Sequence, residues 1–130
     1  MSNVPIQSEE SGLAPNLAGA LAYLFAPLGG ILFLVVEKKN AFVRFHAAQS
    51  VVFGVAFIIA WVALAILGMI LAAVPIIGWL IGVLLTFALW VVGFVLWLML
   101  SYRAYQGKEW ELPVIGVQAR KLIGPPPAVQ

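Results

Sequence analysis

The sequence predicts an all-α integral membrane protein, a helical bundle with three transmembrane helices. Of the 130 residues, 64% are hydrophobic and 9% are charged, whereas a soluble domain is about a quarter charged. Apolar segments flank one polar stretch, residues 37–50, and each is long enough to span a bilayer, which takes about 20 residues. So few charges cannot cover a water-facing surface.

Other membrane and metal-based architectures do not fit the sequence. A membrane β-barrel needs segments of about ten residues in which apolar and polar side chains alternate, but residues 51–74 are apolar on every face. Helices satisfy their own backbone groups, which lipid cannot do. The chain has no cysteine, which excludes a disulfide framework and thiolate metal sites.

The first predicted span covers residues 16–36 and follows a polar tail, residues 1–15, that we expect to be disordered. No basic residue precedes the apolar run, so the span should not be a cleaved signal peptide. We expect a kink or break at Pro27 to Gly30, because proline removes a backbone donor and glycine loosens a helix. One kinked spanning helix is favoured by its length. A re-entrant pair of half-helices is the alternative, although it would leave freed carbonyl groups in need of partners.

Two further spans follow, over residues 47–74 and 78–102. Asn40 is expected to cap the second helix by accepting a hydrogen bond from the amide of Val43 or Phe42, and residues 41–50 form an interfacial lead-in. A short turn at Pro75 joins the two spans. Residues 107–122 form a cytoplasmic segment with a short amphipathic helix from Val114, and residues 123–130 are expected to be disordered. The membrane domain is thus predicted over residues 16–122.

The basic residues predict the orientation of the chain in the plasma or inner membrane. Two groups flank the second and third spans: Lys38, Lys39 and Arg44 before them, and Arg103, Lys108, Arg120 and Lys121 after them. Because two crossings separate the groups, both should lie on the cytoplasmic side, which places the N-terminus outside and the C-terminus inside. We interpret these residues as topology signals that contact anionic lipid headgroups, not as a nucleic-acid site.

Two polar stretches, residues 37–50 (EKKNAFVRFHAAQS) and residues 102–116 (YRAYQGKEWELPVIG), carry a resemblance. Together they resemble a widespread family of small prokaryotic multi-pass membrane proteins of unknown function. That family is distantly similar to the import-channel subunit of the chloroplast inner envelope. The resemblance covers roughly residues 17–122 and implies a small helical membrane domain without established catalytic residues.

The polar residues at the membrane edge are the candidate interaction sites. His46 is the only histidine, and one histidine without a second histidine, a carboxylate on its face or a cysteine makes a poor metal site. We expect Arg44, His46 and Gln49 to act structurally, joining the lead-in to the end of the third span near Arg103 or to the segment around Trp110.

Glu37 could be a proton-relay acid or a partner in an ion pair. A relay places its acid within the bilayer, whereas Glu37 lies beside Lys38 at the edge of an apolar span, which favours an ion pair at headgroup level. We expect no catalytic residue, no bound cofactor and no metal.

Small residues at helical spacing predict a close helix contact. Gly78, Gly82 and Gly93, with Thr86, form a stripe along the third span. A matching set in the second span comprises Ser50, Gly54, Ala65, Gly68 and Ala72. Two contacts fit these stripes equally: the stripes face each other within one chain, or they form a homo-oligomer.

The sequence therefore predicts a non-enzymatic accessory or structural subunit that acts through helix packing. Its expected partners are membrane lipids and a homo-oligomer or larger membrane complex, and no nucleic acid. The alternative is an oligomeric conduit or protein-translocation component in which the break at Pro27 to Gly30 lines a path. No ionisable side chain lies between Val51 and Leu100, which argues against an ion-coupled transporter acting as a single chain.

Overall fold

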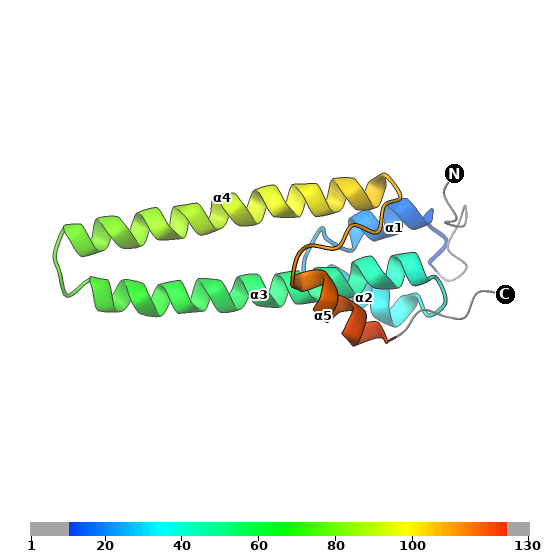
Figure 1. The fold of residues 1–130 in the computed structure, drawn as a ribbon, viewed down its shortest axis with the longest axis horizontal. Coiled ribbons are helices and arrows are strands. Elements are labelled where there is room, and N and C mark those ends of the chain that lie inside the picture. The colour runs from blue at the N-terminus through cyan, green and yellow to red at the C-terminus, as the bar shows by residue number, and fades with distance from the viewer. Residues whose placement is uncertain (1–10, 125–130) are drawn as a thin grey trace.

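The computed structural model describes residues 11–124, and within this range all regular structure is helical. The helices are α1 (Pro15–Leu21), α2 (Leu28–Val36), α3 (Ala41–Leu71), α4 (Ile77–Tyr105) and α5 (Ile115–Ile123) (Figure 1). The prediction of an all-α fold is confirmed. Two of these helices, α3 and α4, are long and apolar enough to cross a membrane.

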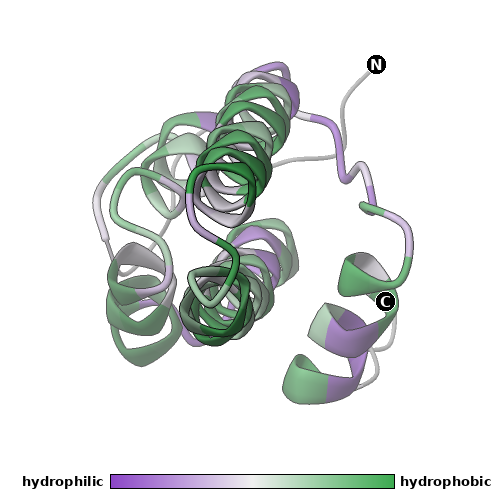
Figure 2. Cartoon of the chain, turned by 90° about the vertical axis from the view of Figure 1, so that its left-hand side faces the viewer, coloured by the Kyte–Doolittle hydropathy of each residue, from purple (hydrophilic) through white to green (hydrophobic). Residues whose placement is uncertain are grey.

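Helices α3 and α4 form a long antiparallel hairpin (Figure 1). The predicted cap is confirmed, since the Asn40 side chain accepts a hydrogen bond of 3.2 Å from the Val43 amide. With 31 and 29 residues, the helices are each roughly 45 Å long, which exceeds a hydrocarbon core of about 30 Å. Figure 2 shows hydrophobic residues around both helices near the turn that joins them.

The segment expected to be one kinked helix over residues 16–36 is two short helices, α1 and α2, joined by a turn over residues 22–27. The start of α1 lies near the end of α4, because Asn16 Nδ2 donates to the Tyr105 carbonyl at 3.0 Å. The end of α2 lies near the start of α3, because Arg44 donates to the Glu37 carbonyl. The chain therefore folds back between α1 and α2, as in the re-entrant alternative.

The expected break is present and ends at Pro27, which directly precedes α2, whereas Gly29 and Gly30 do not break the helix but lie within α2. A Cβ atom on Gly30 would overlap the carbonyl oxygen of Ala47 in α3. The missing side chain thus lets the backbone of α2 approach that of α3 closely.

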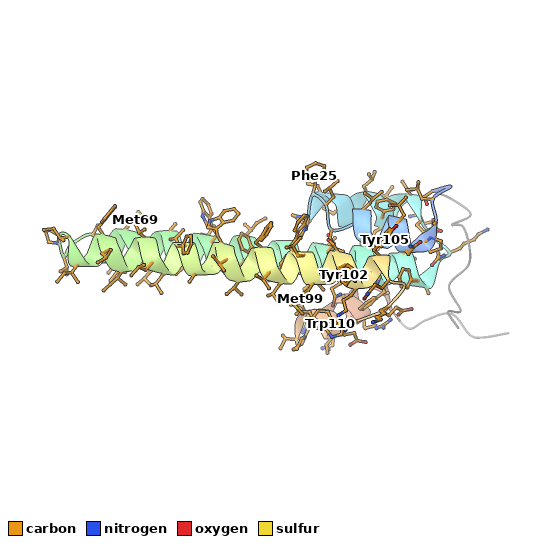
Figure 3. The ribbon with its side chains drawn as sticks, turned by 90° about the horizontal axis from the view of Figure 1, so that it is seen from above. Phe25, Met69, Met99, Tyr102, Tyr105 and Trp110 are labelled. Atoms are coloured by element: carbon orange, nitrogen blue, oxygen red, sulfur yellow. The ribbon has the colours of Figure 1, made fainter. Side chains whose placement is uncertain are left out.

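The connection between α4 and α5, residues 106–114, folds back along the hairpin, and α5 then packs on α3. Ala119 of α5 is buried against Phe45 and Ala48 of α3. Figure 3 shows the α1–α2 pair on one side of the hairpin and α5 with the connection on the other. Residues 1–10 and 125–130 of the expected disordered tails lie outside the described residues, while Pro15 begins α1 and Ile123 ends α5.

The described chain has two regions that differ in packing. We name residues 11–54 and 97–124 the packed half, and residues 55–96 the bare half. Every buried hydrophobic side chain of the core lies in the packed half, at Ala18, Ala22, Tyr23, Phe33, Phe42, Val43, Phe45, Ala47, Ala48, Phe53, Leu100, Ala104, Leu112 and Ala119. The bare half consists of the hairpin alone (Figures 1 and 3).

Candidate functional site

Three polar side chains meet in the interior of the packed half. Tyr23 comes from the turn between α1 and α2, and His46 and Gln49 lie on the same face of α3, three residues apart. All three are completely buried. We name Tyr23, His46 and Gln49 the polar cluster.

Hydrogen bonds join the three side chains of the polar cluster, and the donor and acceptor of each bond can be assigned. His46 Nε2 lies 2.8 Å from the Lys108 carbonyl oxygen, which only accepts, so Nε2 carries the proton. In the neutral imidazole, Nδ1 then accepts from the Tyr23 hydroxyl at 2.9 Å. The Tyr23 oxygen in turn accepts from Gln49 Nε2 at 2.8 Å. Both ring nitrogens of His46 are therefore occupied by partners within the chain.

The Gln49 amide also holds the connection between α4 and α5. Its Nε2 donates to the Trp110 carbonyl at 3.0 Å, and its Oε1 accepts from the Leu112 amide at 2.9 Å. The side chain thus satisfies two backbone groups of a segment that has no regular structure of its own. His46 and Gln49 make the contact with the Trp110 segment that the sequence predicts.

The turn between α1 and α2 has partners for its carbonyl groups. Ser50 Oγ donates to the Ala22 carbonyl at 2.6 Å, and Trp97 Nε1 of α4 donates to the Tyr23 carbonyl at 2.5 Å. Carbonyl groups freed by a break in a helix need such partners where water is excluded. These two bonds remove the physical objection to a re-entrant pair of helices.

The His46 ring is also enclosed by aromatic side chains. Phe42 and Phe45 lie edge-to-face with it, at centroid distances of 4.7 and 5.1 Å. Tyr23 lies edge-to-face at 5.7 Å. The ring is therefore fixed by packing as well as by hydrogen bonds.

Arg44 reaches α2 instead of the end of α4. One of its guanidinium nitrogens donates to the carbonyl oxygens of Leu34 and Glu37, at 3.1 and 2.8 Å. These carbonyls belong to the last turn of α2, where a helix leaves such groups unpaired. Glu37 itself is completely buried, and its position at headgroup level stays a prediction.

Two other arginines secure the connection and α5 from outside. The guanidinium of Arg103 lies over the Trp110 ring at 5.0 Å from its centroid. Arg120 lies over the Phe45 ring at 3.9 Å and donates to the carboxylates of Glu109 and Glu111, at 2.9 and 3.0 Å. The contacts of Arg103 with Trp110 and of Arg120 with Phe45 are cation–π contacts, which add modest stability at partly exposed sites.

The small-residue positions of the second span divide between two neighbours. Ser50 and Gly54 face the α1–α2 turn, since a Cβ on Gly54 would lie 2.5 Å from the Pro27 nitrogen. The remaining small residues line a groove of about 550 Å³ between α3 and α4 in the bare half. The small residues that line it are Ala65, Gly68, Ala72, Gly78, Gly82 and Thr86.

The glycines of the third span differ in how closely they contact α3. A Cβ on Gly78 would overlap the Leu71 carbonyl, and one on Gly93 would overlap the Phe57 ring. A Cβ on Gly82 would lie 3.9 Å from the Gly68 Cα. The structure thus brings the two stripes together within one chain along this part of the hairpin.

The arrangement offers hydrogen bonds but no group of metal ligands. The described residues contain no group of three or more His, Cys, Asp or Glu side chains that could hold a metal ion. Sequence reasoning missed Tyr23, Ser50 as a partner of the turn, and Trp97. Tyr23 carried a signal, because it is the only side chain with a hydrogen-bonding group between Asn16 and Glu37.

Comparison with known proteins identifies a family. Residues 11–118 match the model of the magnetosome magnetite crystal formation protein family. A UPF0132 membrane protein of Methanocaldococcus jannaschii is 43% identical over 106 residues, which cover 81% of this chain and 84% of the relative. A UPF0132 membrane protein of Archaeoglobus fulgidus is 43% identical over 109 residues, 84% of this chain and 95% of the relative.

A second Methanocaldococcus jannaschii protein of the same designation is 35% identical over 105 residues, 81% of this chain and 67% of the relative. No solved structure matches the chain. The relatives bear out the predicted membership of a small prokaryotic membrane protein family of unknown function. Their names state no enzymatic activity.

Proposed function

Since the chain belongs to the magnetosome magnetite crystal formation protein family, we propose that it is a non-enzymatic structural subunit of a membrane, acting through its shape and helix packing. The observation that carries the proposal is the saturation of the polar cluster. Both ring nitrogens of His46 and both polar atoms of the Gln49 amide bond to groups of the same chain. Groups committed in this way hold segments together and are not free for a substrate.

The family's description names magnetite crystal formation. The described part of this chain lacks a cluster of three or more acidic, histidine or cysteine side chains. We propose that this chain contributes to the process named in that description as a membrane component.

We propose a topology of two crossings, by α3 and α4, with the α1–α2 pair inserted part-way from one side. All seven Lys and Arg residues lie in the packed half, so this half belongs at the cytoplasmic face. This replaces the three crossings and the outside N-terminus expected from sequence. It is supported by the contacts of Asn16 with Tyr105 and of Arg44 with Glu37, which bring the start of α1 and the end of α2 to the same end of the hairpin.

Single cysteines in this cysteine-free chain test the topology. In oriented membranes, a thiol at Ser11→Cys should react only from the cytoplasmic side, and a thiol at Val74→Cys only from the opposite side. Reaction of both thiols from the same outer side would mean that the α1–α2 segment crosses completely, as in the three-span arrangement.

The rival proposal is the conduit or translocation component expected as the alternative from the sequence. A conduit requires several copies around a polar path, yet residues 51–100 contain no ionisable side chain. The mass of the protein in native lipid separates the two proposals. A monomer, or a complex with a different membrane protein, supports the structural subunit, and a ring of identical copies that conducts ions or peptide supports the conduit.

A further inference from the structure

The two halves of the molecule occupy different areas in the plane of a membrane. A section through the bare half cuts α3 and α4 alone, whereas a section through the packed half also cuts α1, α2 and α5 with its connection (Figures 1 and 3). With a diameter of about 10 Å, each added helix contributes roughly 80 Å². Three added segments therefore widen the packed half by roughly 240 Å².

The added segments are fixed to the hairpin and cannot be displaced sideways easily. The polar cluster ties the α1–α2 turn and the α4–α5 connection to α3 from opposite sides. On the α2 side, the close contacts of Gly30 with Ala47 and of Gly54 with Pro27 leave no space to compress. The difference in width is therefore a property of the folded chain.

The outer faces of the added segments suit lipid. On the α1–α2 pair, Phe25 and Leu28 are about 70% exposed, and Figure 3 shows Phe25 pointing away from the hairpin. Helix α5 has exposed side chains at Val117 and Leu122 and basic residues in its last turn, and Figure 2 shows hydrophobic and hydrophilic residues on different sides of the helix. Such amphipathic helices lie at the boundary of headgroups and acyl chains, and their binding depends on curvature.

We propose that the protein is a wedge that prefers strongly curved membrane, with its packed half in the convex leaflet. Its partner is the curved lipid bilayer itself. The proposal rests on the topology proposed above, in which the packed half occupies one leaflet. In a convex leaflet the headgroups are spread apart, so a body that is wider in that leaflet fills the space, whereas in a flat bilayer it compresses its neighbours.

The experiment uses the full chain with the single substitution Gln118→Cys, on the exposed side of α5. The protein is reconstituted into vesicles of one lipid mixture, with diameters of about 30 nm and about 200 nm, and the share of thiol that an impermeant reagent reaches is measured. We expect the ratio of outward to inward packed halves to be at least about threefold higher in the small vesicles. Equal ratios at both sizes would overturn the proposal.

Two matched pairs of substitutions test whether width is the cause. Leu28→Ala with Leu32→Ala trims exposed side chains of the packed half, and Leu84→Ala with Phe87→Ala trims exposed side chains of the bare half. The first pair should lower the ratio in small vesicles and the second should raise it, although both remove apolar surface. A change of the same sign in both would overturn the wedge. The thiols at Ser11 and Val74 report the topology separately, so a failed curvature preference is distinguishable from a failed topology.

Discussion

The packed half and the bare half have similar outer surfaces but different interiors. Leu28 and Leu32 of α2 are 69% and 58% exposed, and Phe87 and Leu84 of α4 are 67% and 58% exposed. The buried polar side chains, Glu37, His46, Gln49 and Ser50, all lie in the packed half. In lipid, apolar surface gains little by leaving its surroundings, so helices associate through hydrogen bonds and close backbone contact. The polar residues, and not the apolar ones, therefore decide where this chain folds back on itself.

The largest expected effect is at the contact between α2 and α3. Gly30→Leu places a side chain where the Ala47 carbonyl and Ser50 already lie, and we expect it to destabilise the protein by about 3 kcal/mol or more. Gly68→Leu is the control, because no atom lies within 4 Å of a Cβ built there. Thermal unfolding in detergent, followed by circular dichroism, measures both. Equal midpoints would show that the two halves are packed to the same degree.

The next effect concerns the polar cluster. His46→Leu leaves the Lys108 carbonyl and the Tyr23 hydroxyl without their partner, which should cost about 1–3 kcal/mol. His46→Gln keeps a donor and an acceptor and should retain most of the stability. The same unfolding measurement compares them. If His46→Gln left the fold intact but abolished a biological activity, His46 would have a role beyond structure.

A smaller effect is expected at the α1–α2 turn. Trp97→Phe removes the indole donor to the Tyr23 carbonyl but keeps an aromatic ring beside Phe94, so the loss should be about 1 kcal/mol. Hydrogen exchange at the amides of residues 22–26 should speed up. Trp79→Phe, at an exposed position of the bare half, should leave this exchange unchanged. Equal exchange in both variants would mean that the Trp97 bond does not hold the turn.

The composition and the position of the polar stretches were enough to predict the helical class, the α3–α4 hairpin and the Asn40 cap. The path of the first apolar segment was not predictable in the same way, because its hydropathy fits a crossing as well as a dip. The partners that decide between them, Ser50 and Trp97, are 28 and 74 residues away from the carbonyls they satisfy. Hydropathy reads local sequence, whereas the dip depends on contacts between distant residues.

The candidate site could be predicted from the sequence only in part, because its partners also come from distant residues. His46 and Gln49 stand out as polar residues entering an apolar helix, and their need for partners could be inferred from that alone. The hydrogen-bond partner of Arg44 could not be inferred in this way. Leu34, Glu37 and the end of α4 all offer carbonyl groups near the same membrane edge. That choice depends on the position of α2, whose Gly30 packs closely on Ala47 of α3.

The smallest expected effect tests whether the bare half is covered in the membrane. A Cβ on Gly82 would lie 3.9 Å from the Gly68 Cα, so the groove between α3 and α4 has room, and Gly82→Leu should cost less than about 1 kcal/mol. Gly93→Leu should cost more, because its side chain meets the Phe57 ring, although that ring can rotate away. Leu84→Ile, at an exposed position, is the mild control.

These expected losses of stability hold only if lipid fills the groove. If Gly82→Leu lowered the unfolding midpoint in native lipid as much as Gly30→Leu does, a helix of another chain would occupy the groove, and the contrast between the two halves would belong to the isolated chain and not to the protein in its membrane.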